Sequence, residues 1–82
     1  MDPDQMRAAR VLLRWTAEDL AQKSKVGLST IKRTEATGAP MRLTVANAQA
    51  IQRALEDGGI VFIPENGGGA GVRLKERRLT EK

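Results

Sequence analysis

The hydrophobic pattern of the chain changes period once, at the glycine pair Gly58 and Gly59. Before this pair, apolar residues recur every three or four positions, which is typical of amphipathic helices. After it come two short apolar runs, separated by the turn-forming segment "ENGGGAG", which predict a β-hairpin. We therefore expect a mainly α protein with three parts, namely a helical domain over residues 1–57, a hairpin over 58–76 and a basic tail over 77–82.

Two helices are expected before the middle of the chain. The first begins with Asp2 as N-cap and Pro3 at the first helical position, because Asp accepts hydrogen bonds from free amides and Pro has no amide to leave unpaired. Its inward stripe contains Met6, Ala9, Arg10 and Leu13. The second helix begins after Trp15, which is expected in the core, and has Thr16 as N-cap with Asp19 three residues on, a relative of the capping box.

Two more helices are expected before the change of period. The third runs from about Leu28 to Ala36 and ends near Gly38. The fourth stops at Asp57, is capped by Thr44, and is expected to bury four apolar residues, Val45, Ala48, Ile51 and Leu55. The strands that follow are expected at Ile60–Ile63 and from Val72 to Lys75.

The composition limits which interactions can stabilise the fold and which catalytic groups the chain can supply. The 82 residues include neither His nor Cys, so disulfides, thiol nucleophiles and the usual general bases are missing. We therefore expect no enzymatic activity, no metal and no cofactor. A domain of this size has a modest core, and self-association is the remaining support that small domains commonly use.

The formal net charge is +4, and the cations are clustered. Five of them lie between Lys23 and Arg42 against one acid, Glu35, and five more follow Val72 against two acids. Such clusters favour a polyanionic partner, although a solvated surface would have the same composition. The charged N-terminal segment and the lack of a membrane-length apolar run predict a cytoplasmic protein.

One segment carries a recognisable motif. The stretch "TAEDLAQKSKVGLSTIKRTE" resembles the helix-turn-helix of the Cro/cI-like (XRE) family of phage and bacterial regulators. The family pattern is met at seven positions, Thr16, Leu20, Ala21, Val26, Thr30, Ile31 and Glu35. The resemblance covers about residues 6–55 and implies a compact four-helix, lambda-repressor-like DNA-binding domain, here followed by a C-terminal hairpin. The chain departs from the pattern at four positions, Ala17, Lys25, Gly27 and Thr34.

The resemblance also implies roles for individual residues. It implies a structural ion pair between Arg10 and Glu35. With Ile31 facing the core, helical spacing leaves four candidates for reading base edges, Leu28, Ser29, Lys32 and Arg33. Each has a structural alternative: Lys32 and Arg33 as solvated charges, Ser29 as a hydrogen-bond partner for first-turn amides, and Leu28 as a core residue. The candidates for phosphate contacts are Thr16, Lys23, Thr30, Thr37 and Arg42.

These expectations define a function and its competitors. We expect a homodimeric transcriptional repressor, bacterial or phage-encoded, that binds an inverted repeat of double-stranded DNA through the major groove, with half-sites about one helical turn apart. The expected dimerisation residues are Ile60, Val61, Phe62, Ile63, Val72 and Leu74. The main alternative is the antitoxin of a toxin–antitoxin pair, which would bind a toxin protein and regulate its own operon. A non-specific architectural DNA binder is a second alternative.

Overall fold

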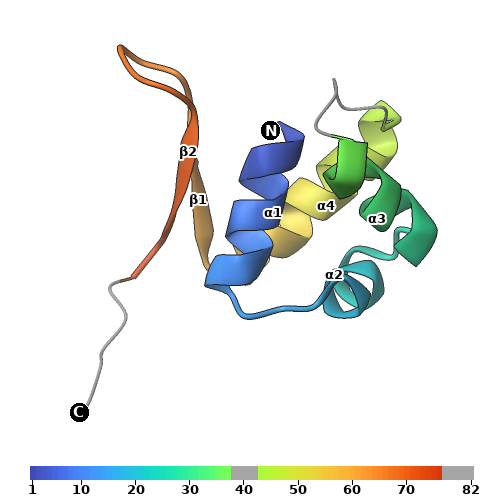
Figure 1. Cartoon of the computed structure of the whole chain (residues 1–82). Coiled ribbons are helices and arrows are strands. Elements are labelled where there is room, and N and C mark those ends of the chain that lie inside the picture. The colour runs from blue at the N-terminus through green and yellow to red at the C-terminus, as the bar shows by residue number, and fades with distance from the viewer. Residues whose placement is uncertain (38–42, 77–82) are drawn as a thin grey trace.

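The computed structural model describes residues 1–37 and 43–76. Within these ranges it is a compact, mainly helical fold of four helices and a small antiparallel sheet (Figure 1). The helices are α1 (Pro3–Leu12), α2 (Ala17–Ser24), α3 (Leu28–Thr37) and α4 (Val45–Asp57), and the strands are β1 (Ile60–Ile63) and β2 (Gly71–Leu74). The predicted mainly α class with a C-terminal hairpin is confirmed at this level.

The predicted helix starts are present and make reciprocal hydrogen bonds. The Asp2 carboxylate accepts from the Gln5 amide at 2.7 Å, and the Gln5 side chain accepts from the Asp2 amide at 3.0 Å. Thr16 and Asp19 form the same arrangement at the start of α2, at 3.0 and 2.8 Å. Thr44 caps α4. Side-chain acceptors therefore satisfy amides that have no partner inside these helices.

Two helices end in residues with left-handed backbone. Arg14 follows α1 with φ 60°, and Lys25 follows α2 with φ 64°. The Arg14 amide donates to the Val11 carbonyl at 2.9 Å, and the Trp15 amide donates to the Arg10 carbonyl at 3.0 Å, which is the Schellman pattern. Glycine is the usual residue at such positions because it has no Cβ to crowd the backbone. Here both positions are occupied by cations.

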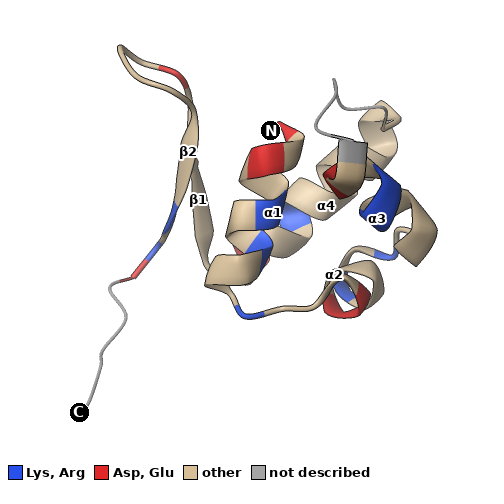
Figure 2. Ribbon diagram, viewed as in Figure 1, with Lys and Arg blue, Asp and Glu red and all other residues tan. Residues whose placement is uncertain are grey.

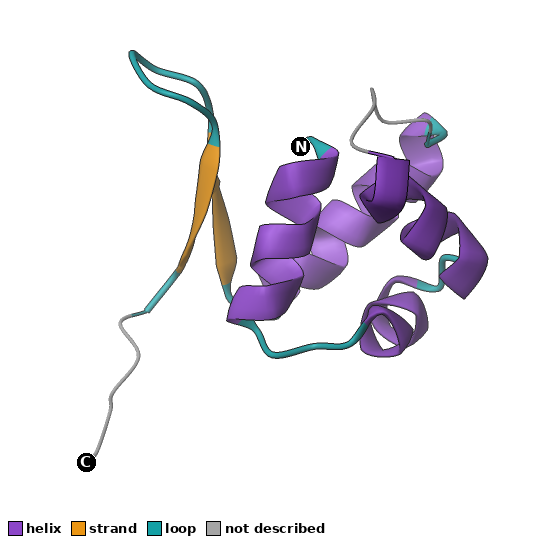
Figure 3. Cartoon of the chain, viewed as in Figure 1, coloured by secondary structure: helices purple, strands orange, loops and turns teal. Residues whose placement is uncertain are grey.

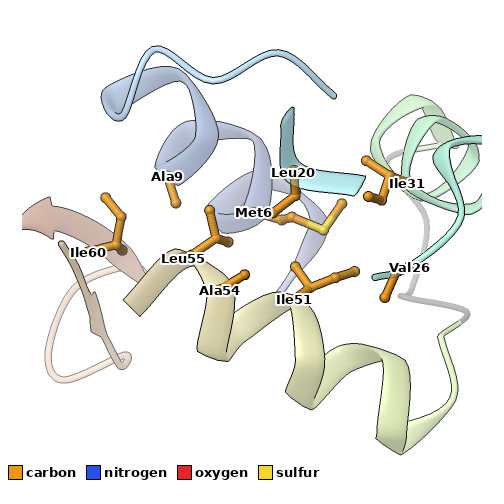
Figure 4. Packing of buried hydrophobic residues seen from close by; sticks show 9 residues of the cluster. All are labelled: Met6, Ala9, Leu20, Val26, Ile31, Ile51, Ala54, Leu55 and Ile60. Carbon is orange, nitrogen blue, oxygen red and sulfur yellow. The ribbon is translucent and has the colours of Figure 1, made fainter. Parts of the chain in front are cut away.

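One hydrophobic cluster holds the helices and the start of the hairpin together (Figure 4). Its buried members are Met6, Ala9, Leu20, Val26, Ile31, Ile51, Ala54, Leu55 and Ile60. Because Ile60 belongs to this cluster, β1 is anchored in the core of the helical part. The prediction that Val45 points inward is wrong, since this side chain is 73% exposed. Leu43, on the other side of the Thr44 cap, packs against the cluster instead.

The two strands pair so that each face of the hairpin has a different environment (Figure 3). Ile60 lies opposite Leu74, and Phe62 lies opposite Val72. These four side chains form what we call the inner face: Ile60 is buried and the other three pack against the core. Val61, Ile63, Gly71 and Arg73 form the outer face, because alternate residues of a strand point to opposite sides.

This arrangement corrects two predictions about the hairpin. The second strand is Gly71–Leu74, one residue earlier than expected. Ile60 is only 3% exposed, so its side chain is occupied in the core and only its outward backbone groups could meet a second copy of the chain. Phe62, Val72 and Leu74 are partly buried against the core of the chain itself. Of the expected dimerisation side chains, Val61 and Ile63 remain on the outer face.

Two glycines make the connection from α4 to β1 possible. A Cβ on Gly58 would lie 2.7 Å from the Trp15 ring, closer than atoms can approach, so this position needs glycine. Gly59 has φ +115°, a conformation that other residues rarely adopt. The end of α4 can thus pack directly beneath Trp15 while the chain turns into β1.

Candidate functional site

The exposed side of α3 contains most of the residues predicted to read DNA. Ser29, Lys32 and Arg33 are exposed, and Leu28 is half-buried. They lie three or four positions apart in pairs, so they are neighbours on one side of the helix. We call these four residues the α3 surface. Figure 2 shows the cationic segment on α3, at the edge of the molecule away from the hairpin.

The opposite side of α3 is held against the domain. Ile31 is completely buried, and Thr34 and Glu35 are buried as well. Thr34 occupies a position where the family pattern has an apolar residue. Its hydroxyl donates to the Thr30 carbonyl at 2.8 Å, so burial does not leave the hydroxyl unsatisfied.

A bidentate ion pair fastens α3 to α1. Arg10 Nε lies 3.0 Å from Glu35 Oε2, and Arg10 Nη2 lies 2.8 Å from Glu35 Oε1. Arg10 Nη1 also donates to the Trp15 carbonyl at 2.9 Å, which ties the α1–α2 connection to the same group. The hydrogen bond to Glu35 raises the pKa of Arg10 above its ordinary value, although desolvation by burial acts in the opposite direction.

This ion pair has a consequence for the α3 surface. Glu35 is the one carboxylate in the sequence of α3, and its side chain is 9% exposed and paired with Arg10. The α3 surface therefore has two cations and a hydroxyl and no acid of its own helix to oppose them. The electrostatic potential that such a surface produces attracts anions.

The turn before α3 is built by local hydrogen bonds. The Ser24 hydroxyl is buried, donates to the Leu20 carbonyl at 2.7 Å and accepts from the Val26 amide at 3.2 Å. Lys25 takes the left-handed position, and the Gly27 carbonyl accepts from the Ile31 amide at 3.2 Å in the first turn of α3. These bonds accommodate the departures from the family pattern at Lys25 and Gly27.

The residues predicted to contact phosphate are more dispersed than the α3 surface. Thr16 is exposed, but its hydroxyl is engaged in the cap of α2. Lys23 Nζ lies 5.0 Å from the centre of the Trp15 ring, a cation–π arrangement. Thr30 is half-buried on α3. The Thr37 side chain and Arg42 lie outside the described residues, so the structure says nothing of their predicted roles.

The sequence patterns did not reveal the role of Gln5. This side chain is part of the α1 cap, yet its Nε2 also donates to the carbonyls of Gly71 at 2.9 Å and Ile63 at 3.4 Å. It therefore joins the start of α1 to the residue pair of the hairpin that lies next to the turn, Ile63 and Gly71. The only signal in the sequence was its position three residues after the Asp2 cap.

The described ranges contain neither a metal-binding cluster nor a helix that could span a membrane. No group of three or more acidic, His or Cys residues there is arranged to hold a metal ion. None of the helices described is both long and apolar enough to cross a lipid bilayer.

The comparisons with known proteins add no further identification. Neither the protein-family models nor the curated proteins contain a match to this chain. A proposal about function therefore depends on the chemistry of the residues described above.

Proposed function

We propose that this protein is a sequence-specific DNA-binding regulator of transcription, acting as a homodimeric repressor on an inverted-repeat operator. In this proposal the domain is lambda-repressor-like, α2 and α3 form a helix-turn-helix, and α3 enters the major groove. The observation that carries the proposal is the α3 surface, which exposes two cations and a hydroxyl, while the one carboxylate of helix α3, Glu35, is buried against Arg10.

Each side chain of the α3 surface has a chemistry that suits base edges. Arg33 can donate two hydrogen bonds to O6 and N7 of guanine, the commonest specific contact in the major groove. Ser29 can donate or accept, and Leu28 can cover a thymine methyl group. Lys32 suits either guanine or a phosphate. The proposal thus assigns specificity chiefly to Arg33.

A comparison within the chain shows that exposed helix faces here are not all of this kind. The outward face of α4 carries Gln49, Gln52, Arg53 and Glu56, and Gln52 donates to Glu56 at 3.1 Å. That face mixes a cation, an acid and amides, which is typical of a solvated surface. The α3 surface differs because it includes no acid, the one carboxylate of helix α3 being buried in the ion pair with Arg10.

The proposal can be tested by fluorescence anisotropy with DNA from upstream of the protein's own gene and a scrambled duplex of the same length. We expect Arg33→Ala to weaken binding to the specific duplex by roughly 10- to 100-fold, the loss of about 1–3 kcal/mol for one bidentate base contact. If Lys32 binds a phosphate, Lys32→Ala should reduce the slope of log affinity against log salt concentration by about one, the contribution of one phosphate contact. Arg53→Ala, on the outward face of α4, is the matched control and should bind as the wild type does.

Three results would count against the proposal. Equal affinity for both duplexes with a steep salt dependence would indicate an architectural DNA binder. Equal losses in Arg33→Ala and Arg53→Ala would show that general charge, rather than the α3 surface, holds the DNA. A stoichiometric partner protein that co-purifies and releases the DNA would favour the antitoxin alternative.

A further inference from the structure

The outer edge of β1 has backbone groups that point away from the hairpin. The Lys75 amide donates to the Gly59 carbonyl at 2.7 Å, and these residues continue the strand register. Because hydrogen-bonded and non-hydrogen-bonded pairs alternate in an antiparallel ladder, Val61 and Ile63 bond to β2, whereas the amides and carbonyls of Ile60 and Phe62 point outward. No hydrogen bond to these outward groups is found among the described residues. We call them the β1 edge.

The β1 edge lacks the features that usually prevent strand pairing. Proteins commonly protect such an edge with charged side chains, a bulge or a proline within the strand. All four residues of β1 are apolar, and the strand has no bulge. The edge is also short and sharply bounded, by Gly59 with its positive φ at one end and by Pro64, which has no amide, at the other.

We propose that two copies of this chain associate by antiparallel pairing of their β1 edges, across a two-fold axis at Val61. In this register Ile60 of each copy lies opposite Phe62 of the other, and each of these two pairs exchanges two hydrogen bonds. An axis at Phe62 would instead set Ile60 opposite Pro64, which has no amide to donate, and an axis at Ile60 would set Phe62 opposite the turn at Gly58. The result is one continuous four-stranded sheet in the order β2, β1, β1, β2.

Charge distinguishes this pairing from the equivalent pairing through β2. Arg73 lies directly opposite Val61 in the hairpin, so it is the residue through which a two-fold axis of β2 would pass. Pairing two β2 edges would bring two Arg73 side chains face to face, with Lys75 close by, and like charges directly opposite each other are destabilising. Pairing two β1 edges places Val61 against Val61. A mixed contact, between β1 of one copy and β2 of the next, would not form a closed two-fold dimer, so further copies could keep adding to its free edges.

The geometry of the fold is compatible with this dimer. The hairpin packs against α1 on one side, and α3 packs against α1 elsewhere, so the two lie on different sides of the molecule (Figure 1). Pairing through β1 therefore leaves the α3 surface of each copy uncovered. The proposal names the subunit contact of the proposed repressor, but the contact itself does not require DNA.

A cysteine cross-link tests the position of the axis. The chain has no Cys, so a single introduced thiol has no competitor. Residues in a non-hydrogen-bonded antiparallel pair have Cα atoms about 4.5 Å apart, which is within the range that a disulfide spans. We expect Val61→Cys to form a covalent dimer under mild oxidation without DNA. Arg73→Cys, on the same outer face, should remain largely uncross-linked.

A charge exchange tests the same axis without covalent chemistry. In sedimentation experiments Val61→Lys and Val61→Glu should each dimerise at least tenfold more weakly than the wild type, and their mixture should recover a heterodimer. Thermal unfolding shows whether each variant is folded, and Val61→Thr is the uncharged control that should still dimerise.

Three results would overturn the proposed interface. The first is a wild-type protein that sediments as a monomer at about 100 μM, far above usual working concentrations. The second is cross-linking of Arg73→Cys as fast as Val61→Cys. The third is a mixture of the charged variants that recovers no dimer. None of these measurements uses DNA. A dimer that binds no specific DNA would contradict the proposed function and leave the interface intact. A monomer that binds specific DNA would contradict the interface and the dimeric form of the proposed repressor, but not its specific binding of DNA.

Discussion

Helix α1 is attached on two sides by two chemically different connections. Toward α3 it is held by the charged pair of Arg10 and Glu35, with contacts at 2.8 and 3.0 Å. Toward the hairpin it is held by the neutral amide of Gln5, which donates to the carbonyls of Gly71 and Ile63. Both connections are partly buried, and both join residues far apart in the sequence.

The difference between them lies in what happens when one partner is lost. A charge left without its partner in a shielded site has a large free-energy cost, whereas a lost neutral hydrogen bond typically costs about 1 kcal/mol. The α3 connection should therefore be the more sensitive to mutation. If α3 reads DNA, this is the connection that determines the orientation of the reading helix.

The largest effect is expected from breaking the charged connection. Glu35→Gln keeps the shape of the side chain but removes the carboxylate that pairs with Arg10, so the free energy of unfolding should fall by about 3 kcal/mol. Urea denaturation measures this change. The double variant Arg10→Met/Glu35→Leu should recover much of the loss, because it removes both charges. A loss under about 1 kcal/mol would mean that the pair behaves like an exposed one.

A smaller effect is expected on the hairpin side. Gln5→Glu retains an acceptor for the Asp2 amide, which Glu satisfies well at this capping position, but it cannot donate to the carbonyls of Gly71 and Ile63. We expect a loss of about 1–2 kcal/mol. Hydrogen exchange should show faster exchange in the strands than in α2 and α3. Uniform exchange across the chain would argue against Gln5 as a specific connection to the hairpin.

The smallest effect should be a gain in stability on the α3 side. Lys25 has left-handed backbone in the turn between α2 and α3, so Lys25→Gly should raise the free energy of unfolding by roughly 0.5–1 kcal/mol, after the greater freedom of glycine in the unfolded chain is allowed for. Lys25→Ala is the matched control and should bring no gain, since it keeps the Cβ. If both variants are equally stabilised, charge and not backbone strain is the cause.

Local interactions explain why so much of the helical part was predictable. The caps at Asp2, Thr16 and Thr44 each involve a residue three positions further on, and such patterns can be read directly from the sequence. The end of α4 at Asp57 was predictable for the same reason, because two glycines follow it. Val45 was misplaced because its orientation depends on how the chain enters α4, which helical spacing does not reveal.

The candidate site was predictable in part. Spacing relative to Ile31 predicted the residues of the α3 surface, and the resemblance to a known motif implied the ion pair that the structure contains. The hairpin was harder, because all four residues of β1 are apolar and the pattern alone does not show which side meets the helices. Only the packing of Ile60 and Phe62 against the core separates the inner from the outer face.

The amino-acid sequence by itself determined the number and kind of elements, their caps and the chemical character of α3, because these depend on neighbouring residues. The tertiary structure decided which partners the long-range groups find: Glu35 for Arg10, the hairpin carbonyls for Gln5, and the Trp15 ring for Lys23. It also decided that β1 points its Ile60 side chain to the core and its backbone edge outward. These choices result from packing the whole chain around one core, which no local pattern specifies.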